Sequence, residues 1–123
     1  MSPSEKKILI VEDERPLARA LELKLAKEGF VVSIATNGQE AIDAISKTTF
    51  DIMILDLVMP LYDGFHVLAH VHDNNIPIKI IVLSNLSQNE DIDKAKGLGA
   101  KEYYVKSNTP ILTLVENVKQ ALS

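Results

Sequence analysis

The sequence contains no cysteine, and this absence excludes disulfide bonds, thiolate zinc sites, iron–sulfur clusters and cysteine nucleophiles. It also contains no tryptophan, and three tyrosines with three phenylalanines are a small set for stacking on bases or sugars. No cluster of basic residues is present to follow a phosphate backbone, and the formal net charge is -4. We therefore expect no direct binding to nucleic acid.

Long apolar runs are missing as well. Residues 1–7 are mostly polar and the next apolar run stops at Glu12, so neither a signal peptide nor a membrane span is predicted. Five glycines and five prolines, without a low-complexity run, disfavour a disordered chain. We expect a cytoplasmic protein that does not insert into a membrane. Its 123 residues, 46% of them hydrophobic, suit a single domain over residues 1–123.

Short apolar runs alternate along the chain with longer segments of helical periodicity. The first run, residues 8–11, precedes a segment in which leucine recurs at every fourth position from Leu17 to Leu25. The last helix has Thr109 as its expected N-cap and Pro110 as its expected first residue. Four further strands are expected at residues 30–34, 52–55, 78–83 and 103–105, each followed by a helix, at 39–45, from 63 onward, at 90–96 and at 111–122.

Five strand–helix units predict an α/β fold. The runs after Lys7, Asp51 and Lys79 are apolar at every position, which is typical of parallel strands covered by helices on both faces. Short connections with right-handed crossovers favour an open, doubly wound sheet. The simplest arrangement is five parallel strands in the flavodoxin-like order 2-1-3-4-5, with five helices.

Chemically useful residues directly follow four of the apolar runs. Glu12 and Asp13 follow the first, Asp56 the third, Ser84 the fourth and Lys106 the fifth. The carboxyl ends of parallel strands meet at one edge of the sheet, where ligands bind in the crevice at which the strand order reverses. We therefore expect all five side chains to lie at one site.

Three carboxylates gathered at one site repel each other, since a pair at ~4 Å costs ~4 kcal/mol at an effective dielectric near 20. Lys106 offsets one charge, and oxygen ligands without cysteine favour Mg²⁺ for the rest. A divalent cation and a lysine facing a carboxylate suit phosphoryl transfer, with Asp56 as the nucleophile. Ser84 is then placed to contact the phosphoryl group and to move the loop that follows it.

Together these residues resemble the receiver domain of two-component response regulators, the chemotaxis-type single-domain regulators included. Glu12 and Asp13 are similar to the acidic pair of that family, and Asp56 within residues 55–60 is similar to its phospho-acceptor. Ser84 is similar to the switch hydroxyl and Lys106 to the lysine of the family. The resemblance extends from one end of the chain to the other.

The resemblance implies a signalling switch that catalyses only its own phosphorylation and a slow hydrolysis back to aspartate. A sensor histidine kinase or a histidine phosphotransfer protein would donate the phosphoryl group to Asp56. The implied ligands of Mg²⁺ are Glu12, Asp13, Asp56 and the backbone carbonyl of Val58.

The resemblance also implies how the signal leaves the domain. Tyr103, three residues before Lys106, would be the aromatic switch residue that acts with Ser84. The fourth helix, fifth strand and fifth helix would then bind a downstream target or an output domain. Homodimerisation through this face after phosphorylation is a further alternative.

Three departures from the commonest pattern of the family concern the site. Ser107 stands where a proline with a cis peptide bond is usual, and a cis bond before serine would cost ~3 kcal/mol. Asn85 replaces a small residue after Ser84, so we expect altered phosphorylation by small-molecule donors. Val58 and Leu86 are apolar where a polar residue could orient an attacking water, which predicts a long-lived phosphoryl state.

Other functions fit less well. An aspartyl phosphatase would need a second aspartate two residues after Asp56, where Val58 stands. A flavodoxin-type protein would need a phosphate-binding loop after the first strand, where residues 12–14 would repel phosphate. The main alternative is a receiver-like scaffold that docks partners independently of phosphorylation.

Overall fold

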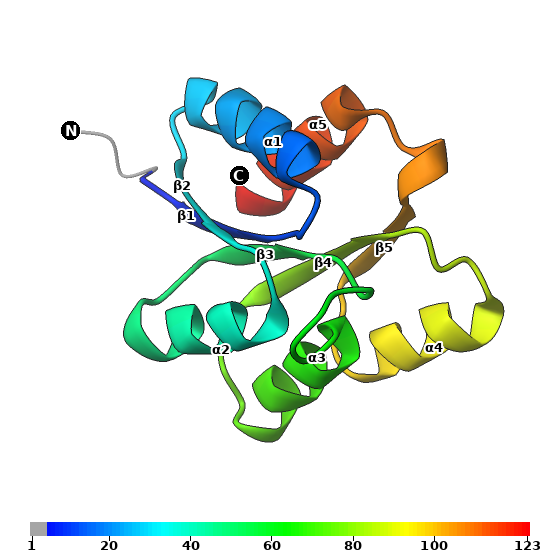
Figure 1. Cartoon of the computed structure of the whole chain (residues 1–123). Coiled ribbons are helices and arrows are strands. Elements are labelled where there is room, and N and C mark those ends of the chain that lie inside the picture. Colours follow the sequence, from blue (N-terminus) through cyan, green and yellow to red (C-terminus); the bar gives the residue numbers. More distant parts are fainter. Residues whose placement is uncertain (1–4) are drawn as a thin grey trace.

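The computed structural model describes residues 5–123 and contains the expected five strands and five α-helices in alternation (Figure 1). The strands are β1 (Lys7–Val11), β2 (Val31–Ala35), β3 (Ile52–Leu55), β4 (Lys79–Ser84) and β5 (Glu102–Val105). The helices are α1 (Arg15–Lys27), α2 (Gly38–Lys47), α3 (Gly64–Asp73), α4 (Asn89–Gly97) and α5 (Ile111–Leu122), with a 3-10 helix at Lys106–Asn108. Across residues 5–123, no helix combines the length and the apolar character needed to cross a membrane.

The sheet confirms the predicted topology. All neighbouring strands are parallel, and their order is β2-β1-β3-β4-β5. Every residue of β3 is buried, as is every residue of β1 and β4 after the first, which explains the apolar runs at residues 8–11, 52–55 and 80–83. The edge strands differ, because β2 alternates between exposed and more buried residues and β5 is half-buried throughout.

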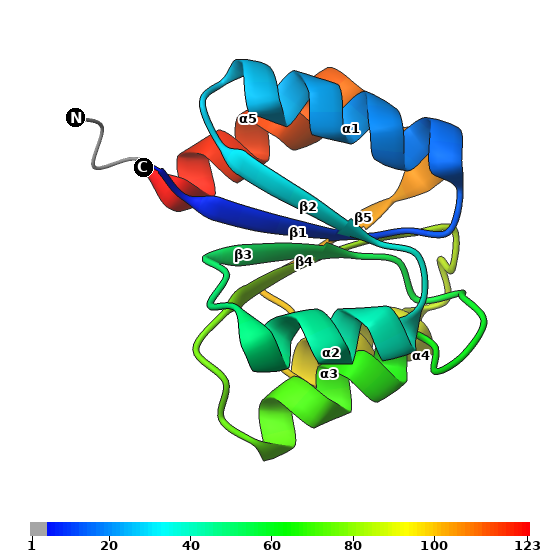
Figure 2. The same ribbon diagram turned by 60° about the vertical axis from the view of Figure 1, so that its left-hand side comes forward.

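Helices cover both faces of the sheet (Figures 1 and 2). Helices α1 and α5 lie on one face, and α2, α3 and α4 lie on the other. Successive strand residues point to opposite faces, so the sheet separates two apolar cores. Leu9 and Tyr103 pack in the core under α2, α3 and α4, whereas Ile8 and Tyr104 pack in the core under α1 and α5.

The start of α5 differs from the prediction. Pro110 occupies the N-cap position with extended backbone angles (φ -60°, ψ 146°), and the helix begins at Ile111. Thr109 is not the N-cap but the C-cap of the preceding 3-10 helix, and its hydroxyl donates a hydrogen bond to the carbonyl of Val105 at 2.9 Å. The sequence expectation was wrong here because the 3-10 helix after β5 extends to Asn108, so Thr109 ends that helix instead of beginning α5.

The loop between β3 and α3 is fixed at both ends. Asp63 caps α3, since its carboxylate accepts a hydrogen bond at 3.0 Å from the backbone N–H three residues later. Leu61 and Tyr62 adopt left-handed backbone conformations (φ 50° and 69°). The carbonyl of Leu61 accepts a hydrogen bond from the N–H of Gln39, and Gly38 lies directly against the backbone of Tyr62. Helix α2 therefore holds the loop that follows Asp56.

Candidate functional site

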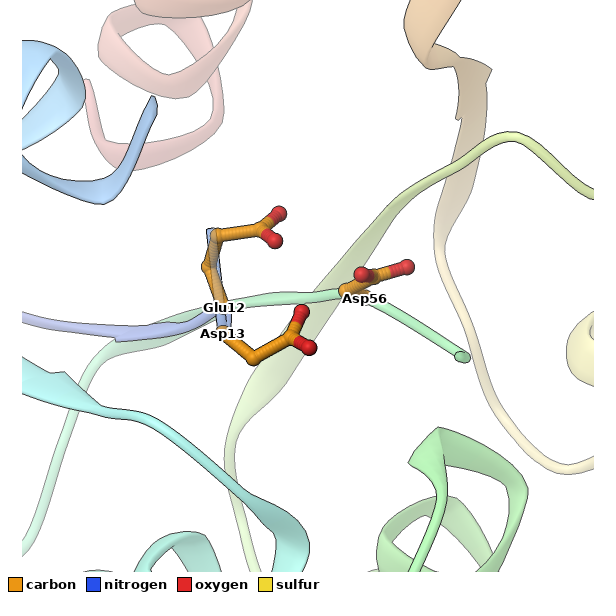
Figure 3. Close-up of side chains that lie close together, drawn as sticks. All are labelled: Glu12, Asp13 and Asp56. Atoms are coloured by element: carbon orange, nitrogen blue, oxygen red, sulfur yellow. The ribbon is translucent and has the colours of Figure 1, made fainter. Parts of the chain in front are cut away.

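Three carboxylates meet at the carboxyl edge of the sheet. Glu12 and Asp13 directly follow β1, and Asp56 directly follows β3. These strands are neighbours with Val11 paired to Leu55, so the residues that follow them are adjacent in space. Carboxylate oxygens of the three acids lie within 4.8 Å of one another, and the side chains face a shared space (Figure 3).

Lys106 reaches this group from the end of β5. Its Nζ lies 2.9 Å from Glu12 Oε1 and 3.1 Å from Asp56 Oδ2, and both carboxylates are almost fully buried. A third contact, at 2.6 Å, joins the Nζ to Glu14 Oε2. The ammonium group therefore carries positive charge into a pocket whose other charged lining residues are all negative, as the sequence predicted.

The charges at the site are not fully balanced. Burial raises the pKa of Glu12 to about 7, and the negative charge of Asp56 adds to this, although hydrogen bonds from Lys106 and from the backbone of Glu14 act in the opposite direction. Burial alone would lower the pKa of Lys106, but hydrogen bonds to Glu14 and Glu12 and the charge of Asp56 hold that pKa well above its usual value. The site favours additional positive charge.

Oxygen donors and excess negative charge fit a hard divalent cation. Glu12, Asp13 and Asp56 can each offer an oxygen, and Asp13 is exposed whereas the other two are buried. Such a half-open set leaves room for water ligands, which Mg²⁺ usually retains. The residues present are therefore consistent with a magnesium site.

Ser84 and Tyr103 lie on the α4 side of the site. Ser84 is fully buried at the end of β4, and its hydroxyl oxygen accepts a hydrogen bond from the N–H of Leu86 at 3.3 Å. The hydroxyl of Tyr103 donates to the carbonyl of Leu86 at 2.6 Å. Burial raises the pKa of Tyr103, and the negative charge of Asp91 adds to this. Both side chains are thus tied to the same loop residue.

A cavity of about 280 Å³ opens over the site. Its lining includes Asp13, Glu14, Asp56, Val58, Asn85 and Lys106. The backbone N–H of Val58 donates to Asp56 Oδ1 at 3.3 Å, and the residue is 56% exposed. Asn85 is exposed and lines this cavity, whereas Ser84 is fully buried.

The segment after Lys106 shows which geometry the peptide bond before Ser107 adopts. No peptide bond among residues 5–123 is cis, so the bond between Lys106 and Ser107 is trans. The backbone continues into the short 3-10 helix, and the Nζ of Lys106 nevertheless reaches Asp56. The serine therefore does not prevent the lysine from entering the pocket.

Sequence reasoning missed the role of Glu14. It treated this residue only as a source of negative charge, whereas the structure places its carboxylate against Lys106. The available signal was its position, since Glu14 follows the acidic pair and precedes α1 at the functional edge of the sheet.

Comparisons with known proteins agree with this geometry. Residues 8–119 match the family described as the response regulator receiver domain. The response regulator TrrA from Thermotoga maritima, solved in complex with Mg(2+)-BeF, is 34% identical over 94% of this chain and 98% of that chain, with a TM-score of 0.81. The Francisella response regulator 1452 receiver domain is 26% identical over 95% of this chain and 96% of that chain, with a TM-score of 0.89. A CheY-like receiver domain protein from Methanospirillum hungatei is 26% identical over 95% of this chain and 93% of that chain, also with a TM-score of 0.89.

The chain belongs to the receiver domain family of two-component response regulators, as the sequence resemblance implied. Its acidic pocket of Glu12, Asp13 and Asp56, with Lys106, is typical of phospho-accepting receivers and consistent with the Mg²⁺ site of receiver homologues. Members of this family are signalling switches rather than conventional enzymes, and they interact with histidine kinases.

The raised pKa of Glu12 predicts a stability that falls with rising pH. Between about 4.5 and about 7 the folded protein holds a proton on Glu12 that the unfolded chain has released, so folding binds a proton. The free energy of unfolding of the metal-free protein should therefore fall across this window, by about 3 kcal/mol at most. Urea denaturation at a series of pH values measures this slope.

Glu12→Gln is the control for this prediction, because it removes the titrating group and should flatten the slope. Glu40 does not interfere, since hydrogen bonds from Thr36 lower its pKa and its contribution is lost only below the window. A wild-type protein that becomes more stable between pH 5 and pH 8 without added metal would contradict the prediction.

Proposed function

We propose that this chain, over residues 1–123 as one receiver unit, accepts a phosphoryl group on Asp56 from a histidine kinase or a histidine phosphotransfer protein. The observation that carries this proposal is the contact of Asp56 with Lys106 Nζ at 3.1 Å, within a pocket that also holds the carboxylates of Glu12 and Asp13. A nucleophilic carboxylate, a fixed ammonium group and a candidate cation site are the parts that phosphoryl transfer requires.

In the proposed reaction, an oxygen of Asp56 attacks the phosphorus in line with the bond to the histidine nitrogen. The new O–P bond forms as the P–N bond breaks, and the imidazole leaves with the electron pair and then binds a proton. Lys106 donates a hydrogen bond to one phosphoryl oxygen, and the hydroxyl of Ser84 donates to another. Glu12, Asp13, Asp56 and the backbone carbonyl of Val58 would hold Mg²⁺, which supplies positive charge for the phosphoryl oxygens when bound.

The switch that we propose starts at Ser84. Formation of a hydrogen bond from its hydroxyl to the phosphoryl group would draw the following loop inward, and Tyr103 is linked to that loop through Leu86. Helix α4 is weakly anchored, since Ala95 is its only buried residue. A small movement of the loop can therefore change the face formed by α4, β5 and α5.

This face is the proposed output surface. It would bind a downstream target or an output domain, or a second copy of the chain after phosphorylation. The proposal includes no direct contact with nucleic acid and no insertion into a membrane.

Binding of beryllofluoride with Mg²⁺ tests the proposal. Beryllofluoride mimics a phosphoryl group on a carboxylate, so the wild-type protein should show chemical-shift changes in NMR spectra around Asp56, Ser84 and Tyr103. Asp56→Asn should abolish these changes, whereas Asp43→Asn, on the exposed surface of α2, should retain them. A wild-type protein without an Asp56-dependent response would identify it as the phosphorylation-independent scaffold instead.

The lifetime of the phosphoryl group gives a further prediction. Val58 is exposed in the cavity and its side chain has no polar atom with which to orient water. Val58→Asn places an amide at the same point, so the phosphorylated variant should lose its phosphoryl group severalfold faster than the wild type. Decay of the phosphorylated protein, followed by intact mass spectrometry after removal of the donor, measures the rate. A wild-type rate equal to or faster than that of the variant would contradict this expectation.

A further inference from the structure

The ammonium group of Lys106 is shared among three carboxylates that differ in their surroundings. Glu12 and Asp56 approach it from inside the pocket, with side chains 3% and 5% exposed, whereas the side chain of Glu14 is 58% exposed. The contact with Glu14 is the shortest of the three, at 2.6 Å compared with 2.9 Å and 3.1 Å. The exposed carboxylate thus holds the lysine from the mouth of the cavity.

The backbone around Glu14 favours this contact. Glu14 is the N-cap residue of α1, and a proline follows in the first turn of the helix. Its backbone N–H donates to Glu12 Oε2 at 3.0 Å, which fixes the two glutamates relative to each other. Within residues 5–123, the acids that could share one metal ion are Glu12, Asp13 and Asp56, and Glu14 is not among them. Its partner is therefore the lysine.

A phosphoryl group on Asp56 would compete with Glu14 for Lys106. A lysine ammonium has three N–H donors, and three carboxylates already lie within contact distance of it. An incoming phosphoryl oxygen must therefore replace one of these acceptors. Glu14 is the one that can turn out into solvent, because the other two side chains are enclosed by the pocket.

We propose that Glu14 is a positioning residue that holds Lys106 at the mouth of the cavity until a phosphoryl group displaces it, and that it selects against small anionic phosphodonors. This inference rests on the phospho-accepting function proposed above. Acetyl phosphate is a free dianion that must pass Glu14 without other contacts to favour its entry. A phosphohistidine on a protein partner is brought in by a larger docking surface, whose binding energy can offset the repulsion.

The test compares Glu14→Gln with Glu28→Gln. The control removes the same charge from another lysine contact, since Glu28 lies 3.0 Å from Lys119 between α1 and α5. With Mg²⁺ present, Glu14→Gln should bind beryllofluoride about fivefold more tightly than the wild type, as expected for the loss of one competing exposed ion pair. Glu28→Gln should bind it as the wild type does. Acetyl phosphate should likewise phosphorylate Glu14→Gln faster than the wild type, and Glu28→Gln at the wild-type rate.

A measurement without metal or phosphodonor tests the position of the lysine directly. The NMR signal of the Lys106 ammonium group, assigned by its absence in Lys106→Met, should shift in Glu14→Gln and stay unchanged in Glu28→Gln. An unchanged signal, or a beryllofluoride affinity of Glu14→Gln that equals or falls below that of the wild type, would overturn the inference. Failure of the phospho-accepting function itself would be recognised separately, because the wild type would then give no response that depends on Asp56.

Discussion

Lys106→Met is expected to abolish the response to beryllofluoride and to destabilise the metal-free protein near pH 8 by about 2 kcal/mol. Methionine retains much of the apolar stem of the side chain but removes the ammonium group. Glu12 and Asp56, which are almost fully buried and now contact that group at 2.9 Å and 3.1 Å, would be left without a positive partner. Breaking a buried pair by removing one member is costly because the remaining charge stays desolvated. Urea denaturation measures the loss.

The loss of stability in Lys106→Met should be larger near pH 8 than near pH 5.5. Near pH 5.5 Glu12 is largely protonated, since its pKa is raised to about 7, so less uncompensated charge remains and the loss should be smaller. Lys119→Met is the matched control, because Lys119 contacts Glu28 and Glu116 on the surface and its removal should change stability much less than the removal of Lys106. Equal losses in the two variants near pH 8 would contradict the assigned role of the pocket charges.

Gly64→Ala is expected to destabilise the protein by about 3 kcal/mol and to weaken binding at the site at the same time. A Cβ atom on Gly64 would lie 2.3 Å from the carbonyl oxygen of Asp56 and 2.6 Å from the Cα of Leu57. Both are backbone atoms, so they cannot move aside as a side chain would. The N–H of Gly64 also donates to the carbonyl of Leu57, so a shift of α3 would displace the segment that carries Asp56.

Gly97→Ala is the control, and it should stabilise the protein instead of destabilising it. Gly97 is the last residue of α4, and a Cβ atom there would meet no atom within 4 Å. Alanine should therefore stabilise the helix by about 0.5 kcal/mol through its higher helix propensity. Thermal denaturation and beryllofluoride affinity of both variants give the two readouts. A Gly64→Ala protein with wild-type values of both would show that the contact of α3 with the Asp56 segment is not required.

The fold could be predicted because its signal is repeated along the chain. Apolar runs in β1, β3 and β4 indicate strands buried on both faces, and these are the three central strands of the sheet. Once parallel strands are inferred, their carboxyl ends must share one edge. Glu12, Asp56 and Lys106 follow such strands, so their proximity could be predicted from the sequence.

Local choices between competing hydrogen bonds could not be predicted in the same way. Thr109 is a residue type that favours the N-cap, but it ends the 3-10 helix after β5, and Pro110 is the N-cap of α5. The partner of Glu14 depends on the reach of Lys106 from β5, a distance that no pattern in the sequence contains. Leu61 and Tyr62 lack the usual sequence signal for positive φ, and their conformation depends on packing against α2.

The helices are secured to the sheet to different extents. Three residues of α1 and three of α5 are buried in one layer, whereas α4 in the opposite layer buries only Ala95. Sub-global opening should therefore begin at α4 and the adjoining edge strand, at a free energy well below that of complete unfolding. Helix α4 and strand β5 thus form a flexible part of the molecule beside a more rigid remainder. A disturbance at this edge of the sheet will displace α4 and β5 first.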